Sequence, residues 1–244
     1  MDTRARSGAG ARTSRLHDRV VDAIGRQIVT GQLLPGSTIV PEQLRAEFAV
    51  SASVVREAFR ALQEKGLLKA KSKVGTKVLA STQWNFLDPQ VIQWRIESPH
   101  RDEQIAEFFD VRLGLEPVAA QLMADRAAVI GVSRLRACVT RMKQAADRDD
   151  LPAFVRADVE YHATLVAESG NQMFASLRGI VELAVGVRET LFFPFPGHAR
   201  HGISLHEQLV NDIAAGSPTA WQTARELLIA ARDEMRIELA ARER

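Results

Sequence analysis

The stretch "EFAVSASVVREAFRALQEKGLLKAKSKVGTKV", residues 47–78, decides the fold class of this chain. Ser51 can cap a helix that Gly66 ends, and the apolar positions inside it follow the spacing i, i+3, i+4, i+7, at Val55, Ala58, Phe59 and Leu62. A lysine-rich hairpin follows, with strands expected at 67–70 and 76–80. A helix with a basic ribbon behind it favours a DNA reader; the alternative is an ordinary helix with a solvated basic face.

Two further helices are expected ahead of this stretch. Residues 16–30 have the pattern of an amphipathic helix, entered from Thr13 or Ser14 and closed by a glycine. After a Pro-Gly turn, Pro41 is suited to begin a short helix that reaches Phe48. With the wing, these elements predict a winged helix-turn-helix over residues 16–80, preceded by a flexible basic N-terminus, residues 1–15.

The predicted DNA contacts come from the recognition helix and the wing. On the helix, polar and basic side chains lie opposite the apolar stripe, and the helix N-terminus can lie on a phosphate or a base edge in the major groove. On the wing, lysines flank the turn and would meet the DNA backbone. The predicted contact residues are Ser51, Ser53, Arg56, Arg60, Lys71, Lys73, Gly75 and Lys77.

Composition limits the protein class. The chain has 244 residues, 46% of them hydrophobic and 25% charged, which suffices for two ordinary domains with real cores. No run approaches the ~18 apolar residues of a membrane span, and no apolar segment follows the basic N-terminus, so we expect a soluble, unexported protein. The single cysteine, Cys138, excludes an internal disulfide framework and fits a reducing cytoplasm.

The net charge of +2 conceals an asymmetry between the two parts of the chain. Residues 1–80 hold 14 Lys and Arg against 7 Asp and Glu, whereas residues 81–244 hold 18 against 23. A basic small domain joined to a mildly acidic larger one suggests that the first meets a polyanion and the second a different partner.

The C-terminal part reads as helical throughout. Residues 81–102 are expected to form a packed linker, because they contain Trp84, Trp94 and a cluster of apolar residues, with Pro89 breaking the periodicity. Beyond it, helical periodicity and breaks predict an all-helical bundle over residues 103–241. The expected helices are 103–128, 133–149, 151–169, 172–190, 203–215 and 218–241.

One polar cluster in this bundle has the residue types of a metal site. In "RADVEYHATL", Asp158 and His162 stand four residues apart on one helical face, and His206 comes from a later helix. Carboxylate and neutral imidazole are ligands of divalent transition metals. On spacing alone, a polar patch without a metal is an equal alternative.

The N-terminal motifs resemble the GntR family of regulators. "GQLLPGSTIVPEQLRAEFAVSASVVREAFRALQEKGLLKAKSKVGTKV" is similar to its G-x-L-x-P-G turn, its V-S-x-S-x-V-R-E-A helix and its E-K-G-L…G-T-x-V wing, so the resemblance covers residues 16–80. The family usually has Arg after the first Ser of the recognition helix, where this chain has Ala52. The resemblance implies operator DNA as the partner of this domain.

Residues 103–241 resemble the FCD effector domain of the FadR subfamily. "FFDVRLGLEPVAAQLMADRA" is similar to its opening helix, with Arg112 and Glu116, and "FVRADVEYHATLVAESGNQMF" to its D-x-x-x-H helix. The resemblance implies an effector-binding and dimerisation domain, and one divalent metal ion, zinc or a similar ion, held by Asp158, His162 and His206. The family's fourth ligand, a histidine, is replaced by Leu228. Either water and effector oxygens complete the sphere, or the three residues bind the effector directly.

The linker "TQWNFLDPQVIQW" resembles that of sugar-acid operon repressors. This implies a cytoplasmic homodimeric repressor, not an enzyme, that a galactonate-type aldonate releases from its operator. The expected effector-binding residues are Arg112, Glu116, Asp158, His162, Arg188 and His206, with the two arginines taking the carboxylate. The alternatives are another carboxylate effector such as gluconate, a three-ligand metalloenzyme, and a binding or scaffolding protein with degenerate operator contacts.

Overall fold

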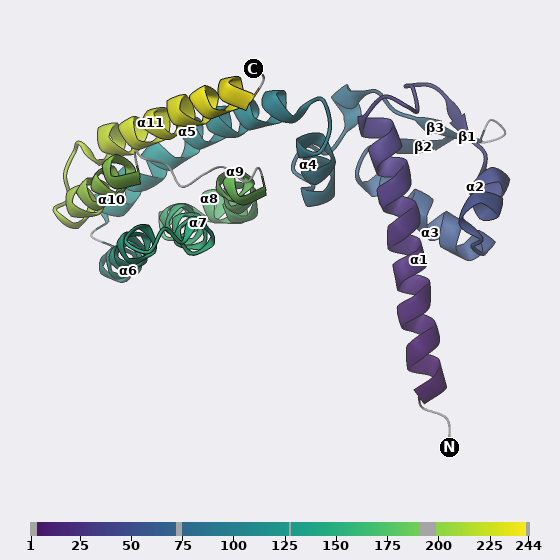
Figure 1. Ribbon diagram of the computed structural model, residues 1–244, viewed down its shortest axis with the longest axis horizontal. Coiled ribbons are helices and arrows are strands. Elements are labelled where there is room, and N and C mark those ends of the chain that lie inside the picture. The colour runs from purple at the N-terminus through teal and green to yellow at the C-terminus, as the bar shows by residue number, and fades with distance from the viewer. Residues whose placement is uncertain (1–3, 72–74, 127, 191–198, 243–244) are drawn as a thin grey trace. The chain divides into compact units, whose positions relative to one another are not determined.

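The computed structural model describes residues 4–71, 75–126, 128–190 and 199–242, and it is mainly helical (Figure 1). The chain divides into two compact units, the first ending at Gln104 and the second beginning at Ile105. Within those ranges, no helix is long and apolar enough to cross a membrane.

The first unit contains the predicted winged helix-turn-helix, which is confirmed. Its strands form one antiparallel sheet in the order β1-β3-β2. Lys77 of β3 lies opposite Thr38 of β1 on one side and Lys69 of β2 on the other. The short strand β1 was not predicted. The elements are α1 (Arg4–Val29), β1 (Thr38–Ile39), α2 (Pro41–Phe48), α3 (Ala52–Glu64), β2 (Leu68–Lys71), β3 (Gly75–Val78), the 3-10 turn η1 (Ser81–Gln83) and α4 (Pro89–Ile96).

Local sequence explains the turn between α2 and α3. Ala49 adopts a left-handed conformation with φ of 51° and ends α2. Ser51 then caps α3, its side chain accepting a hydrogen bond from the backbone N–H of Val54. The apolar stripe of α3 is buried as predicted, with Phe59 and Leu62 in the core of this unit.

The first helix begins at Arg4, well before the capping residues Thr13 and Ser14 that the sequence suggested, so residues 4–15 are not an irregular tail. The segment ahead of those residues contains no proline, and its Ala and Arg residues favour a helix while Gly8 and Gly10 disfavour one. Because adding residues to an existing helix costs far less than starting one, the packed part of α1 can extend through such a sequence.

The segment expected as a linker contains a helix that packs on α1. Pro89 does not break the structure but begins α4, after Asp88 caps it by accepting hydrogen bonds from two backbone N–H groups. Trp94 is buried in the core of the first unit, and its indole N–H donates to Asp22 over 2.8 Å. Its ring lies so close to Gly25 that a methyl group there would overlap it. Part of residues 81–102 is therefore built into the first unit.

The second unit is the predicted helical bundle. The ends of its helices differ from the expected ones by up to four residues, and one expected helix is divided. The span 172–190 is two helices, because a tight hydrogen bond from Leu177 N–H to Phe174 O ends the first. The last stretch before residue 203 already belongs to a helix, with Gly202 inside it. The helices are α5 (Arg101–Asp125), α6 (Val129–Ala146), α7 (Leu151–Ala167), α8 (Gln172–Ser176), α9 (Arg178–Thr190), α10 (Ala199–Ala214) and α11 (Ala220–Arg242).

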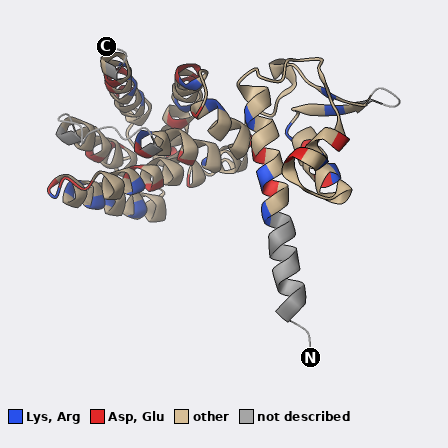
Figure 2. Cartoon of the chain, turned by 45° about the vertical axis from the view of Figure 1, so that its right-hand side comes forward, with Lys and Arg blue, Asp and Glu red and all other residues tan. Residues whose placement is uncertain are grey.

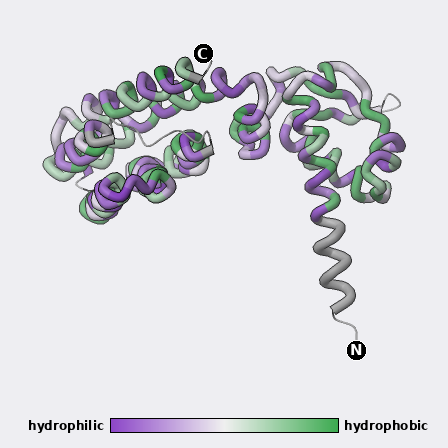
Figure 3. Tube along the Cα trace, viewed as in Figure 1, coloured by the Kyte–Doolittle hydropathy of each residue, from purple (hydrophilic) through white to green (hydrophobic). Residues whose placement is uncertain are grey.

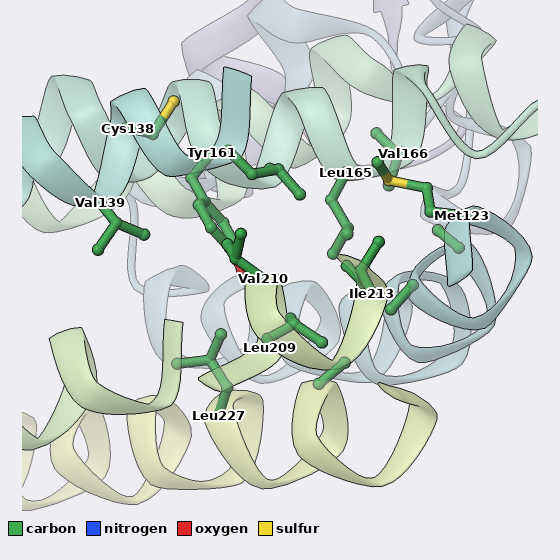
Figure 4. Packing of buried hydrophobic residues seen from close by; sticks show 14 of the residues in the cluster. Met123, Cys138, Val139, Tyr161, Leu165, Val166, Leu209, Val210, Ile213 and Leu227 are labelled. Carbon is green, nitrogen blue, oxygen red and sulfur yellow. The ribbon is translucent and has the colours of Figure 1, made fainter. Parts of the chain in front are cut away.

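The core of the second unit lies between its helices. Hydrophobic and hydrophilic residues alternate along the helices in Figure 3, as amphipathic helices require. Side chains of α7 and α10 point toward one another in Figure 4, with Tyr161 and Leu165 on one helix and Leu209 and Ile213 on the other. All four are fully buried, so α7 and α10 are fixed against each other.

Candidate DNA-binding face and candidate ligand site

The outer face of α3 displays the predicted polar residues. Ser53, Arg56 and Arg60 are all exposed, on the side of the helix away from the buried stripe. Arg60 also lies 3.4 Å from Glu64 one turn later, whereas no ion pair within the described residues involves Arg56. Ser51 and Ser53 join their hydroxyls over 2.8 Å at the helix N-terminus. The structure thus brings these four residues to one exposed helix face.

The wing contributes basic residues from its strands, coloured blue in Figure 2. Lys77 is partly engaged within the protein, because its ammonium donates to the Gly36 carbonyl over 3.2 Å. Lys69 is exposed and lies opposite Lys77, so the two share one face of the sheet. Lys69 was not among the predicted contacts, although strand alternation signalled it. Lys71 ends β2 opposite Gly75, whose φ is +94°, and Lys73 lies outside the described residues.

In the second unit, α7 and α10 bring together Asp158, His162 and His206. The Nε2 atoms of the two histidines lie 3.2 Å apart. The Oδ1 atom of Asp158 lies 3.1 Å from Nε2 of His206 and 3.3 Å from Nε2 of His162. This oxygen is inaccessible to solvent and has no hydrogen-bond partner within the described ranges. The three predicted ligands therefore converge on one buried point.

The partners of the two rings decide where their protons lie. Nδ1 of His206 faces the Gly202 carbonyl at 2.7 Å, and Nδ1 of His162 faces the Glu116 carboxylate at 2.5 Å. Both partners accept only, so each Nδ1 carries the proton, and in its neutral form each ring presents a lone pair at Nε2. With both rings neutral, three lone pairs point at one another, which is unfavourable unless a proton or a metal ion lies between them.

Glu116 positions this arrangement from α5. It accepts from Arg112 Nε over 2.6 Å with one oxygen and binds His162 with the other. Burial alone would raise the pKa of Glu116, but the Arg112 guanidinium and His162 outweigh it and hold that pKa at about 2. Burial likewise lowers the pKa of His162, yet Glu116 raises it above its usual value overall. A carboxylate behind a ligating histidine is the common outer partner of metal sites.

The donor set fits a divalent transition metal. Ligands ~2.0–2.1 Å from a tetrahedral zinc ion lie ~3.3 Å from each other, which is the spacing of these three atoms. Within the described residues this is the one group of three His, Cys, Asp or Glu residues with such convergent ligand atoms. One carboxylate oxygen and two imidazole nitrogens leave a fourth position, and the buried Leu228 lines the small cavity beside them.

Two adjoining cavities extend from the cluster. The smaller, about 40 Å³, is lined by Arg112 and Leu228 among others, and the larger has a volume of about 300 Å³. Asp158, His206 and Arg188 line both. The six predicted effector residues therefore lie around one site, with Glu116 behind it.

Both predicted carboxylate-binding arginines already have acidic partners. Arg112 is paired with Glu116, and Arg188 donates from Nη2 to Glu234 of α11 over 3.1 Å. Glu234 lines the larger cavity and was missed by the sequence analysis. Tyr161 was missed as well; its hydroxyl donates to the His206 carbonyl and thereby holds α10 on α7. Neither contact has a signal in sequence spacing.

Comparison with known proteins gives a separate family match for the N-terminal and the C-terminal part of the chain. Residues 107–241 match the model of the FCD domain, and residues 16–78 match the model of the bacterial regulatory proteins of the gntR family. The galactonate operon transcriptional repressor of Escherichia coli is 35% identical over 161 residues, which are 66% of this chain and 69% of that protein. The gluconate operon transcriptional repressor of Bacillus subtilis is 26% identical over 61% of this chain and 53% of its own length.

Solved structures show the same fold. The GntR protein of Streptococcus agalactiae aligns with a TM-score of 0.51 at 21% identity, covering 89% of this chain and 99% of that one. Lar of Listeria monocytogenes aligns with a TM-score of 0.55 at 18% identity, covering 91% and 95%. These likenesses concern the arrangement of the helices and the wing.

Proposed function

The chain belongs to the GntR family of bacterial regulatory proteins and has an FCD domain, and from this premise we propose that it is a transcriptional repressor that a sugar acid releases from its operator. The main support for this proposal is that one chain combines an exposed basic recognition helix with a separate, buried ligand cavity. Family membership also answers the enzyme alternative: the chain is a regulator and not an enzyme.

The DNA-binding part of the proposal rests on α3 and the wing. Arg56 is exposed on a helix of the length that fits a major groove, where an arginine can bind a guanine edge with two hydrogen bonds. Lys69 and Lys77 share the wing face and would contact phosphates. A single winged helix offers few contacts, so we expect a homodimer that reads two half-sites.

The ligand part rests on the cavity. Asp158, His162 and His206 would hold a divalent ion, which when bound attracts a carboxylate or hydroxyl oxygen of the effector into its open position. Arg112 and Arg188 border the same space with guanidinium groups that suit a carboxylate. A cavity of about 300 Å³ has room for a small sugar acid.

The choice among sugar acids rests on relatives. The galactonate repressor of E. coli shares 35% identity, which favours galactonate as the first effector to test; the gluconate repressor of B. subtilis makes gluconate the alternative. Effector binding must favour a dimer geometry that does not fit the operator, because a ligand with equal affinity for both states shifts nothing.

Binding of the purified protein to DNA from upstream of its own gene tests the proposal. We expect sequence-specific binding in a fluorescence anisotropy titration, and release of the labelled DNA by galactonate or gluconate. Light scattering should give about twice the 26.9 kDa chain mass. Binding without sequence preference would contradict the regulator proposal, while specific binding that no sugar acid reverses would contradict only the effector.

A further inference from the structure

The carboxylate of Glu234 has one oxygen with a partner and one without. Oε2 accepts from Arg188 Nη2 over 3.1 Å. Oε1 is inaccessible to solvent and has no hydrogen-bond partner in the part of the chain that the structure describes. The residue lines the cavity of about 300 Å³, together with Asp158 and His206. Glu234 therefore brings an unpaired hydrogen-bond acceptor to the wall of this cavity.

A buried carboxylate oxygen without a donor is costly, and native proteins rarely leave one unpaired. The last torsion of a glutamate side chain is soft, so the carboxylate can turn either oxygen toward a ligand. A carboxylate only accepts hydrogen bonds, so the missing partner has to be a donor. Another carboxylate would be repelled at this position.

The residues around Glu234 indicate that the hydrogen-bond donor is a hydroxyl group. Arg188 lies 3.1 Å from Glu234 and already balances its charge, so the unpaired oxygen needs a hydrogen-bond donor and no second cation. The hydroxyl groups of a sugar acid are uncharged donors, and Phe154, Leu227 and Ile237 line the same cavity with apolar side chains. An uncharged donor is the group that fits.

We propose that Glu234 recognises a hydroxyl group of the effector and thereby selects polyhydroxy acids over unsubstituted carboxylates of the same chain length. This inference rests on the proposed function, because it takes the site to be one for a carboxylate effector. It adds a specificity-determining residue on α11 that lies outside the metal-type cluster and outside the two arginines.

Calorimetry on the full-length protein with galactonate and with hexanoate tests the inference. Both probes have six carbons and one carboxylate, so any general change in carboxylate affinity, including one caused by a freed Arg188, cancels in the ratio of their dissociation constants. Glu234→Met removes both acceptor oxygens at similar volume. Glu226→Met makes the same change at an exposed position two turns earlier on α11 and is the matched control.

We expect wild type and Glu226→Met to prefer galactonate strongly, and Glu234→Met to lower that preference by ~10-fold to ~100-fold, the usual effect of losing a hydrogen bond to a charged acceptor. If Glu234→Met does not fold, Glu234→Gln keeps the shape and should lower the preference by ~10-fold. An unchanged ratio in a folded Glu234 variant overturns the inference and leaves the repressor proposal standing. Wild type that binds neither probe overturns the effector assignment itself.

Discussion

The Nε2 atoms of His162 and His206 lie 3.2 Å apart while the other nitrogen of each ring is held by an acceptor, Glu116 for one and the Gly202 carbonyl for the other. When both rings are neutral, neither has a proton to share with its neighbour. The Asp158 carboxylate beside them also only accepts. A divalent metal ion bound by these three residues would supply the positive charge that completes the cluster without changing any ring orientation.

Substitution of His206 tests the metal site. His206→Ala removes one of three ligands, so we expect metal content to fall from about one ion per chain to background by mass spectrometry after dialysis. Chelation should lower the thermal unfolding midpoint of wild type but not of the variant, because an ion that binds only the folded state stabilises it. His201→Ala, also on α10 but outside the three-residue cluster, is the control. Equal metal content in wild type and His206→Ala would rule out the site.

Glu116 should affect the metal affinity of this site without being a metal ligand. Glu116→Gln removes the charge that orients His162 and compensates Arg112, so we expect the affinity for zinc to fall by ~10-fold to ~100-fold. Competition against a zinc-binding dye measures this. Asp110→Asn, exposed on the same helix, should leave the affinity unchanged. A variant Glu116→Gln with wild-type zinc affinity would show that the carboxylate has no positioning role.

Substitutions of Arg56 and Lys69 should have different effects on DNA binding. Arg56→Ala should weaken binding to the operator by ~1–3 kcal/mol and leave binding to unrelated DNA unchanged, because a contact with a base edge recognises the DNA sequence. Lys69→Ala should weaken binding to all DNA sequences, because a contact with a phosphate does not depend on the sequence. It should also reduce the slope of log affinity against log salt concentration by about one. Anisotropy titrations at several salt concentrations separate the two. The same loss on both DNAs for Arg56→Ala would contradict the placement of α3 in the groove.

Ala52 offers a gain-of-affinity test. It is the first residue of α3 and is only partly buried, in the place where the family usually has arginine. Ala52→Arg adds a cation beside the presumed phosphate path, so we expect tighter DNA binding and a salt slope steeper by about one. The same titrations measure it. No change in the slope would mean that this end of the helix does not approach the backbone.

Gly25 makes a stability prediction for the first unit. A methyl group at Gly25 would lie 2.2 Å from the Trp94 ring, so Gly25→Ala should destabilise that unit by ~1–3 kcal/mol through overpacking. Gly114→Ala is the matched control, because no atom lies within 4 Å of the added methyl group and α5 gains ~0.5–1 kcal/mol in helix propensity. Urea unfolding followed by tryptophan fluorescence compares the two. A stabilising Gly25→Ala would contradict the packing of α4 on α1.

Local patterns predicted the features that depend on neighbours in sequence. The cap at Ser51, the stripe through Phe59 and the four-residue spacing of Asp158 and His162 all follow from helical period. The spacing of residues in the sequence could not predict features that depend on packing between helices. The contact of His206 with His162 depends on how α10 packs on α7, and the pair of Arg188 with Glu234 joins residues 46 apart. The break at Leu177 has no proline beside it, and the nearby Gly179 lies inside α9 and does not mark it.

The contact of Trp94 with Gly25 and Asp22 sets where the chain can be cut. A fragment that stops at residue 80 has all the helix-turn-helix and wing residues, yet it removes the Trp94 ring that packs on Gly25 and the indole N–H that donates to Asp22. Chimeras that exchange DNA-binding modules between relatives should therefore carry α4 with the winged helix and join after Gln104, where the first compact unit ends. Junctions placed at the end of the wing would be expected to yield insoluble or protease-sensitive products.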